Sequence, residues 1–232
     1  MGYDESRDFA RNPERRKRHN LQGPIDDAFM ESFICVRGTG KPWSQEQQDW
    51  AEWTLDRFAG EFDKWLRGKI RIVDDKDLTD EAMKKSNIIL FGDPGSNSVL
   101  AKMLKDLPIQ WSRDAIQVND QTYDPKTHGL SMIYPNPSTP EGYRGPHRYV
   151  VVNSGHTMHE KDFRASNSWL FPRLGDIAIQ KFTKNPKSGY DEEIEWAALF
   201  NSAWKLPPSG VKSAGNFEPS PSQSLVVRRR SD

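Results

Sequence analysis

The residues best suited to chemistry follow two apolar runs, each at a point where a β-strand should end. The first run, 88–91, breaks at Gly-Asp-Pro-Gly (92–95), after which apolar residues return at helical spacing. The second run, 149–153, leads into Ser154, Gly155 and His156. Because open α/β sheets bind ligands beyond the carboxyl ends of their strands, we treat both segments as candidate sites.

The turn after residue 91 matches no recognised catalytic or phosphate-binding motif. No Lys-Ser/Thr pair follows it, the third glycine of a dinucleotide fingerprint is missing, and Ser96 lacks the flanking glycines of a nucleophile elbow. What remains is a helix start with main-chain amides for an anion and Ser96, Asn97 or Ser98 as a cap. The competing interpretation is a capped structural turn. The predicted binding residues are Gly92, Asp93, Gly95, Ser96, Asn97 and Asn153.

The second segment offers a serine and a histidine as nucleophile and base. Asp176 or Asp162 would orient the imidazole, which gives the predicted catalytic set Ser154, His156 and Asp176. Serine and histidine two residues apart rarely face each other on a strand-to-turn backbone. A hydrogen-bonded loop is therefore the competing interpretation.

Metal and cofactor signals are weak. His156-x-x-His159 resembles a zinc motif only loosely, because the helical His-Glu-x-x-His order is missing. The single cysteine, Cys35, excludes an internal disulfide, and its apolar surroundings predict a buried structural thiol. We predict no metal and no cofactor, and we interpret the carboxylate runs at 74–77 and 191–193 as solvated faces.

Composition narrows the class of partner. Lys+Arg and Asp+Glu both number 33, so no global charge favours nucleic acid or an acidic membrane. No apolar run reaches the ~18 residues that cross a bilayer, and the first thirty residues hold no signal-peptide core. We expect a soluble chain, cytoplasmic as it stands and exported if a longer precursor carries a signal.

Strand and helix patterns alternate along the chain. Strands are predicted at 32–37, 69–73, 87–91, 130–134 and 149–153, an aromatic amphipathic helix over 42–68, and a hairpin in 111–123 that turns at 119–120. The pattern predicts an α/β fold: a three-layer, mostly parallel twisted sheet flanked by helices, with an antiparallel excursion near 111–134. The predicted organisation is a flexible basic arm (1–19), one α/β domain (20–206) and a disordered tail (207–232).

Several longer sequence segments resemble those of a known protein family. Residues 19–30 (His-Asn-Leu-Gln-Gly-Pro-Ile-Asp-Asp-Ala-Phe-Met), 38–43, 87–97, 133–137 and 148–155 occur in this order in one group of proteins. Over about 19–206 the chain resembles the C-terminal region of bacterial proteins of the prolyl-oligopeptidase or dienelactone-hydrolase-like α/β-hydrolase family. The resemblance implies that the serine elbow lies upstream in a separate domain. No Gly-x-Ser-x-Gly occurs here, so no catalytic residue of the family is carried over.

Three functions therefore stay open. The first is an accessory domain of a serine hydrolase or peptidase, which binds its catalytic domain, another subunit or the substrate. The second is a freestanding esterase, lactonase or peptidase that uses Ser154 and His156 or the 93–97 turn. The third is binding of a small anion or nucleotide at the helix start in 92–98.

Overall fold

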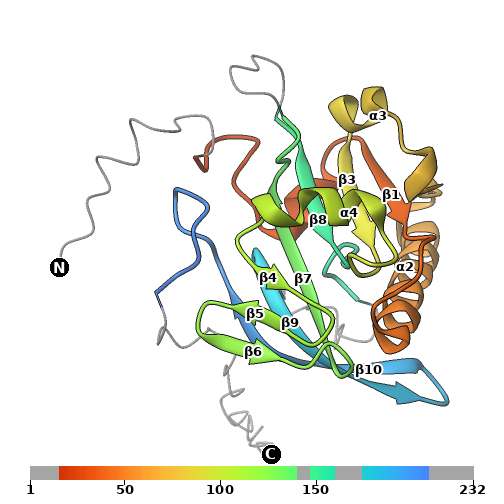
Figure 1. Ribbon diagram of the computed structural model, residues 1–232. Coiled ribbons are helices and arrows are strands. Elements are labelled where there is room, and N and C mark those ends of the chain that lie inside the picture. The colour runs from red at the N-terminus through yellow and green to blue at the C-terminus, as the bar shows by residue number, and fades with distance from the viewer. Residues whose placement is uncertain (1–15, 140–146, 160–173, 209–232) are drawn as a thin grey trace, which may run out of the picture.

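The structure is a computed structural model that describes residues 16–139, 147–159 and 174–208 (Figure 1). It contains a seven-stranded mixed sheet, a small three-stranded sheet and few helices, which confirms the α/β class. The described elements in chain order are η2 (Ile25–Phe29), β1 (Phe33–Arg37), α2 (Gln45–Leu66), β2 (Ile72–Asp74), η3 (Asp75–Asp77), α3 (Asp80–Lys85), β3 (Asn87–Phe91), α4 (Ser98–Met103), η4 (Leu104–Asp106), β4 (Gln110–Trp111), β5 (Ile116–Val118), β6 (Gln121–Tyr123), β7 (His128–Pro135), β8 (Tyr149–Val152), β9 (Ile177–Asn185) and β10 (Gly189–Ala198).

The prediction of a mostly parallel sheet is wrong. The strand order is β10-β9-β7-β8-β3-β1-β2, and only the pairs among β8, β3, β1 and β2 are parallel. The pairs β8–β7, β7–β9 and β9–β10 are antiparallel, as is the whole small sheet. The sequence analysis assigned no strand to 177–198, where a short turn joins β9 to β10. Strands joined in this way must pair antiparallel.

The two faces of the large sheet are covered differently. In the strand order, β2 lies on one side of β1, whereas β8 lies on the opposite side of β3. Because connections between parallel strands are right-handed, α2, which follows β1, and α4, which follows β3, lie on opposite faces of the sheet. On its face, α2 buries Trp50 and Phe58. The face bearing α4 is shared with the small sheet, where Trp111 and Ile116 join the main core (Figure 1). Helices therefore flank this sheet only in part.

Most local predictions are confirmed. Helix α2 begins after Ser44, whose hydroxyl accepts the N–H of Gln47. Thr79 caps α3, and β5 turns into β6 at Asn119, which has φ 55°. None of the helices within the described ranges is long and apolar enough to cross a membrane.

Gly129 is a position where α2 packs tightly against the sheet. A Cβ at this position of β7 would lie 2.3 Å from the Trp50 ring, which is fully buried and stacked on Phe182. Because that ring has no room to move, we expect Gly129→Ala to cost about 1–3 kcal/mol of unfolding free energy in urea titration. Gly60→Ala is the control, since a Cβ at Gly60 in α2 meets nothing within 4 Å. It should stabilise by up to ~1 kcal/mol, and equal effects of the two variants would contradict the packing described here.

Candidate functional site

Asp93 organises the turn after β3. Its carboxylate accepts four main-chain N–H groups: Oδ1 from Gly95 and Ser96 at 2.8 and 2.9 Å, and Oδ2 from Trp43 and Ser44 at 2.7 and 3.0 Å. The carboxylate is almost fully buried. It therefore joins the turn to the loop that precedes α2.

Two asparagines complete this network. Asn97 caps α4, accepting the N–H groups of Val99 and Leu100, and its own Nδ2 donates to the carbonyls of Val36 and Phe91. From the end of β8, Asn153 pairs with both main-chain groups of Gly92, at 2.8 and 3.0 Å. The six predicted binding residues are thus brought together by the fold.

The main-chain amides of this turn all have protein partners. Gly92 to Leu100, apart from Pro94, donate to Asn153, Ser96, Asp93, Asp75 or Asn97. An anion at the start of α4 would have to displace two buried carboxylates, those of Asp75 and Asp93. The geometry therefore favours a structural role for the turn.

Asp75 is one of the carboxylates interpreted from sequence as solvated, and this interpretation is wrong. It is buried beside the same turn, where it accepts from Thr39 N and Oγ1 and from Ser98 N. Burial acts in the opposite direction, but these hydrogen bonds lower the pKa of Asp75 to about 2. In the second run, the Glu192 side chain is also buried, paired with Arg57 at 2.6 Å.

The predicted set Ser154, His156 and Asp176 has no continuous hydrogen-bond relay in the described structure. Ser154 Oγ donates to the carbonyl of Gly155 at 2.8 Å, and Asp176 accepts from Lys17 and from the N–H of Phe200. His156 Nδ1 is buried without a hydrogen-bond partner. Asp162, the alternative orienting residue, lies outside the described residues.

The carboxylate whose charge acts on His156 is Asp26, which the sequence analysis did not name. Asp26 belongs to η2 and accepts from Thr157 N and Oγ1 at 2.7 and 2.5 Å. Burial lowers the pKa of His156 against the field of Asp26, so the neutral imidazole is favoured. The ring packs edge-on against Phe58 of α2, with centroids 5.3 Å apart. A neutral imidazole is therefore present, but Ser154 Oγ makes no described hydrogen bond to it.

Asp176 differs from the other buried carboxylates because one of its oxygens has no hydrogen-bond partner among the residues that the structure describes. Its side chain is fully buried, Lys17 is its ion-pair partner, and Oδ1 has no hydrogen-bond partner. Lys17 also lies 4.9 Å from the centroid of the Trp204 ring. The domain boundary predicted at residue 19 thus falls within a described segment that is tied to the core.

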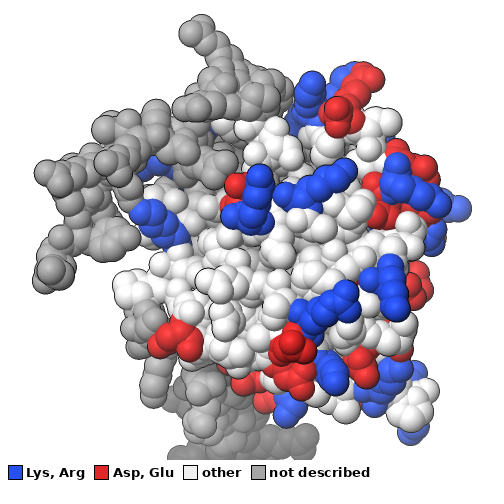
Figure 2. Space-filling view, in the orientation of Figure 1, with Lys and Arg blue, Asp and Glu red and all other residues white. Residues whose placement is uncertain are grey.

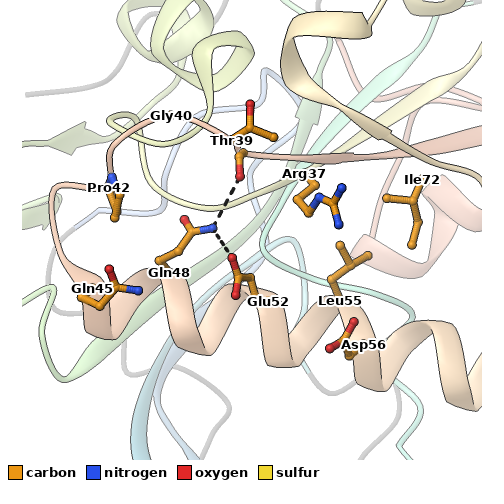
Figure 3. A pocket seen from close by; sticks show the side chains of 11 residues that line it. Arg37, Thr39, Gly40, Pro42, Gln45, Gln48, Glu52, Leu55, Asp56 and Ile72 are labelled. Atoms are coloured by element: carbon orange, nitrogen blue, oxygen red, sulfur yellow. Dashed lines mark hydrogen bonds between the residues drawn. The ribbon is translucent and has the colours of Figure 1, made fainter.

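An open pocket of about 460 Å³ lies at the carboxyl end of β1, beside α2 and the first residue of β2 (Figure 3). Its walls come from the segment between Arg37 and Pro42, from the face of α2 between Gln45 and Asp56, and from Ile72. Arg37, Gln48 and Glu52 point toward a common space in Figure 3. This volume is typical of sites for small organic ligands.

Two sequence features indicate this pocket, although it was not predicted from them. Gly38-Thr39-Gly40 directly follows a predicted strand, and Glu52 and Asp56 stand four residues apart on the predicted helix. Residues four apart lie on one helix face. The sequence does not show that this face of α2 borders the loop 38–40 and not bulk solvent.

A metal centre finds no support in the described ranges, where no three His, Cys, Asp or Glu side chains are placed to hold an ion. Cys35 is buried in β1, and burial raises the pKa of its thiol, as expected for a structural cysteine.

Comparison with known proteins yields no relative: no protein-family model, no curated protein and no solved structure matches the chain.

Proposed function

We propose that this chain is a non-catalytic, ligand-binding α/β domain that serves a serine hydrolase or peptidase as an accessory module. The observation that carries the proposal is the pocket at the carboxyl end of β1. Open α/β sheets bind ligands at the carboxyl ends of their strands. In contrast, Ser154 and Asp176 make hydrogen bonds to other groups, and His156 Nδ1 has no hydrogen-bond partner within the described ranges.

The proposed catalytic partner comes from the sequence resemblance, which places the serine elbow in an upstream domain. We expect such a partner to bind an uncharged surface and not to be attracted by a patch of one charge. Basic and acidic side chains are interspersed around a broad uncharged area on the face seen in Figure 2. The aromatic residues of α2 serve mainly the core, although Trp65 near its carboxyl end is 55% exposed.

A freestanding hydrolase is the second candidate, favoured by one observation. The charge of Asp26 acts on His156, and burial lowers the pKa of the imidazole, so the neutral form that can accept a proton is favoured. For catalysis, Ser154 Oγ would have to leave the Gly155 carbonyl and turn to the imidazole.

Labelling of the purified chain separates these candidates. We expect a fluorophosphonate probe, followed by peptide mass spectrometry, to leave Ser154 and Ser96 unmodified while a control serine hydrolase is labelled. Fragment screening by NMR should produce shifts that cluster at Arg37, Gly38 and Gly40. Labelling of Ser154 that disappears in His156→Ala would overturn the accessory-domain proposal and establish the hydrolase.

A further inference from the structure

The hydrogen-bond donors that line the pocket are already engaged. Arg37 donates through Nε and Nη2 to Asp74 Oδ1 at 3.1 and 2.7 Å. Thr39 donates through N and Oγ1 to Asp75 at 3.0 and 2.7 Å. A ligand rich in acceptors would have to compete with Asp74 and Asp75 for these donors, and within the described residues Arg37 Nη1 is the side-chain donor of this pair that keeps no acceptor.

The amide N–H groups of the pocket are engaged in the same way, whereas Gln48 Oε1 is buried without a hydrogen-bond partner among the described residues. Gln48 Nε2 donates to Glu52 Oε1 at 2.7 Å, and Gln45 Nε2 donates to Asp49 at 2.8 Å. The main-chain N–H groups of Gly38 and Gly40 donate to the carbonyls of Phe91 and Ser96. Figure 3 shows the Gln48 amide between the loop and Glu52.

Acceptors, by contrast, remain open. Glu52 Oε2 and the whole Asp56 carboxylate have no hydrogen-bond partner in the described part of the chain, and both residues are exposed at the pocket. The charge of Arg37 is matched by Asp74, with Lys76 at 3.9 Å from the other oxygen of Asp74 and outside the lining. The lining therefore carries one guanidinium and two carboxylates. Glu52 and Asp56 both act on the charge of Arg37, but they also repel each other one helical turn apart, and the lining keeps a net negative charge.

Apolar surface accompanies these carboxylates. Leu55, between them on α2, is buried, and Ile72 of β2 is 40% exposed. A ligand that matches both features has a positively charged donor group and a short hydrocarbon chain. A phosphate or carboxylate ligand would instead meet the field of Glu52 and Asp56.

We infer that the pocket binds an organic cation, a primary alkylammonium group with a short apolar chain. The inference rests on the proposed ligand-binding function and adds the chemical class of the ligand. The ammonium would donate to Glu52 and Asp56 and relieve their mutual repulsion, while the chain would lie on Leu55 and Ile72. A free amine and a lysine side chain share this chemistry.

The test compares three probes of equal chain length that differ only in their head group: pentylamine, pentanol and pentanoate. Titrations followed by NMR should show pentylamine binding with shifts at the pocket, with pentanol and pentanoate weaker by about tenfold or more. The double variant Glu52→Gln, Asp56→Asn should lower pentylamine affinity by about tenfold. Asp63→Asn is the matched control, because Asp63 is exposed on α2 and does not line the pocket.

Failure of the inference and failure of the proposed function give different results. Equal or tighter binding of pentanoate, or an unchanged pentylamine affinity in the double variant, would overturn the cation inference and leave a ligand-binding pocket. If no probe and no fragment shifts the pocket resonances, both proposals fail. If pentylamine binds, a lysine derivative blocked at both main-chain ends is titrated next. Binding tighter than that of pentylamine indicates that the natural ligand is a lysine side chain of a peptide, and weaker binding indicates a free amine.

Discussion

Replacing Asp93 with alanine is expected to produce the largest loss of stability of any single change proposed for this domain. The variant would leave the N–H groups of Trp43, Ser44, Gly95 and Ser96 without the carboxylate that accepts them. The Ser96 N–H keeps the main-chain carbonyl of residue 93 as an acceptor, so three groups lose theirs. At about 1–3 kcal/mol for each unsatisfied group, we expect a loss of about 3–9 kcal/mol in urea unfolding. This is a large fraction of a typical domain stability of about 5–15 kcal/mol.

A graded series makes this prediction specific. Asp93→Asn keeps one acceptor oxygen and should lose less than Asp93→Ala, whereas Asp63→Ala, at an exposed site on α2, should stay within ~0.5 kcal/mol of the parent. Because Asp93 holds the loop that borders the pocket, Asp93→Asn should also weaken ligand binding. An Asp93→Ala variant as stable as Asp63→Ala would contradict the network described here.

Replacing Lys17 with methionine is expected to have the second largest effect. The change keeps the length of the side chain but leaves the Asp176 carboxylate buried without its ion-pair partner. Removing one member of a buried pair typically costs 3–5 kcal/mol, so we expect a loss of about 3 kcal/mol or more. Arg18→Met is the control, because Arg18 is the exposed neighbour.

The pH dependence of the Lys17→Met variant follows from the same carboxylate. Burial raises the pKa of Asp176 above its ordinary value of 3.8, while Lys17 opposes the shift. The folded state therefore keeps a proton on Asp176 at pH values where the unfolded chain has lost it. The contribution of Asp176 to stability is fully present below pH 3.8 and is lost as pH rises through the raised folded pKa.

Without Lys17 this shift grows, so the difference in unfolding free energy between parent and variant should be larger at pH 7.5 than at pH 4.5. A second change, Asp176→Asn, should restore part of the stability at pH 7.5, because it removes the unpaired charge. If the difference were the same at both pH values, the loss would come from packing and not from the charge of Asp176.

Local patterns were sufficient for most of the elements that surround the site. Apolar runs and helical spacing predicted β1, β3, β8 and α2, and Asn97 was among the residues predicted to cap the helix after β3. These features depend on neighbours within a few residues along the chain. Neither β9 nor β10 was predicted, and residues 191–193 within β10 were interpreted as a solvated face.

The sequence by itself determined the α/β class and the strand-turn-helix at 87–103, because both follow from short-range periodicity and capping. The tertiary structure alone decided which polar groups are buried and which face an opening. Asp75, Asp93 and Glu192 look alike in sequence to Glu52 and Asp56, yet the first three are paired inside the fold and the last two line a pocket. The physical reason is that a carboxylate's role depends on desolvation and on donors brought from 23 to 135 residues away, such as Ser98 for Asp75, Trp43 for Asp93 and Arg57 for Glu192. Sequence periodicity carries no information on those distances.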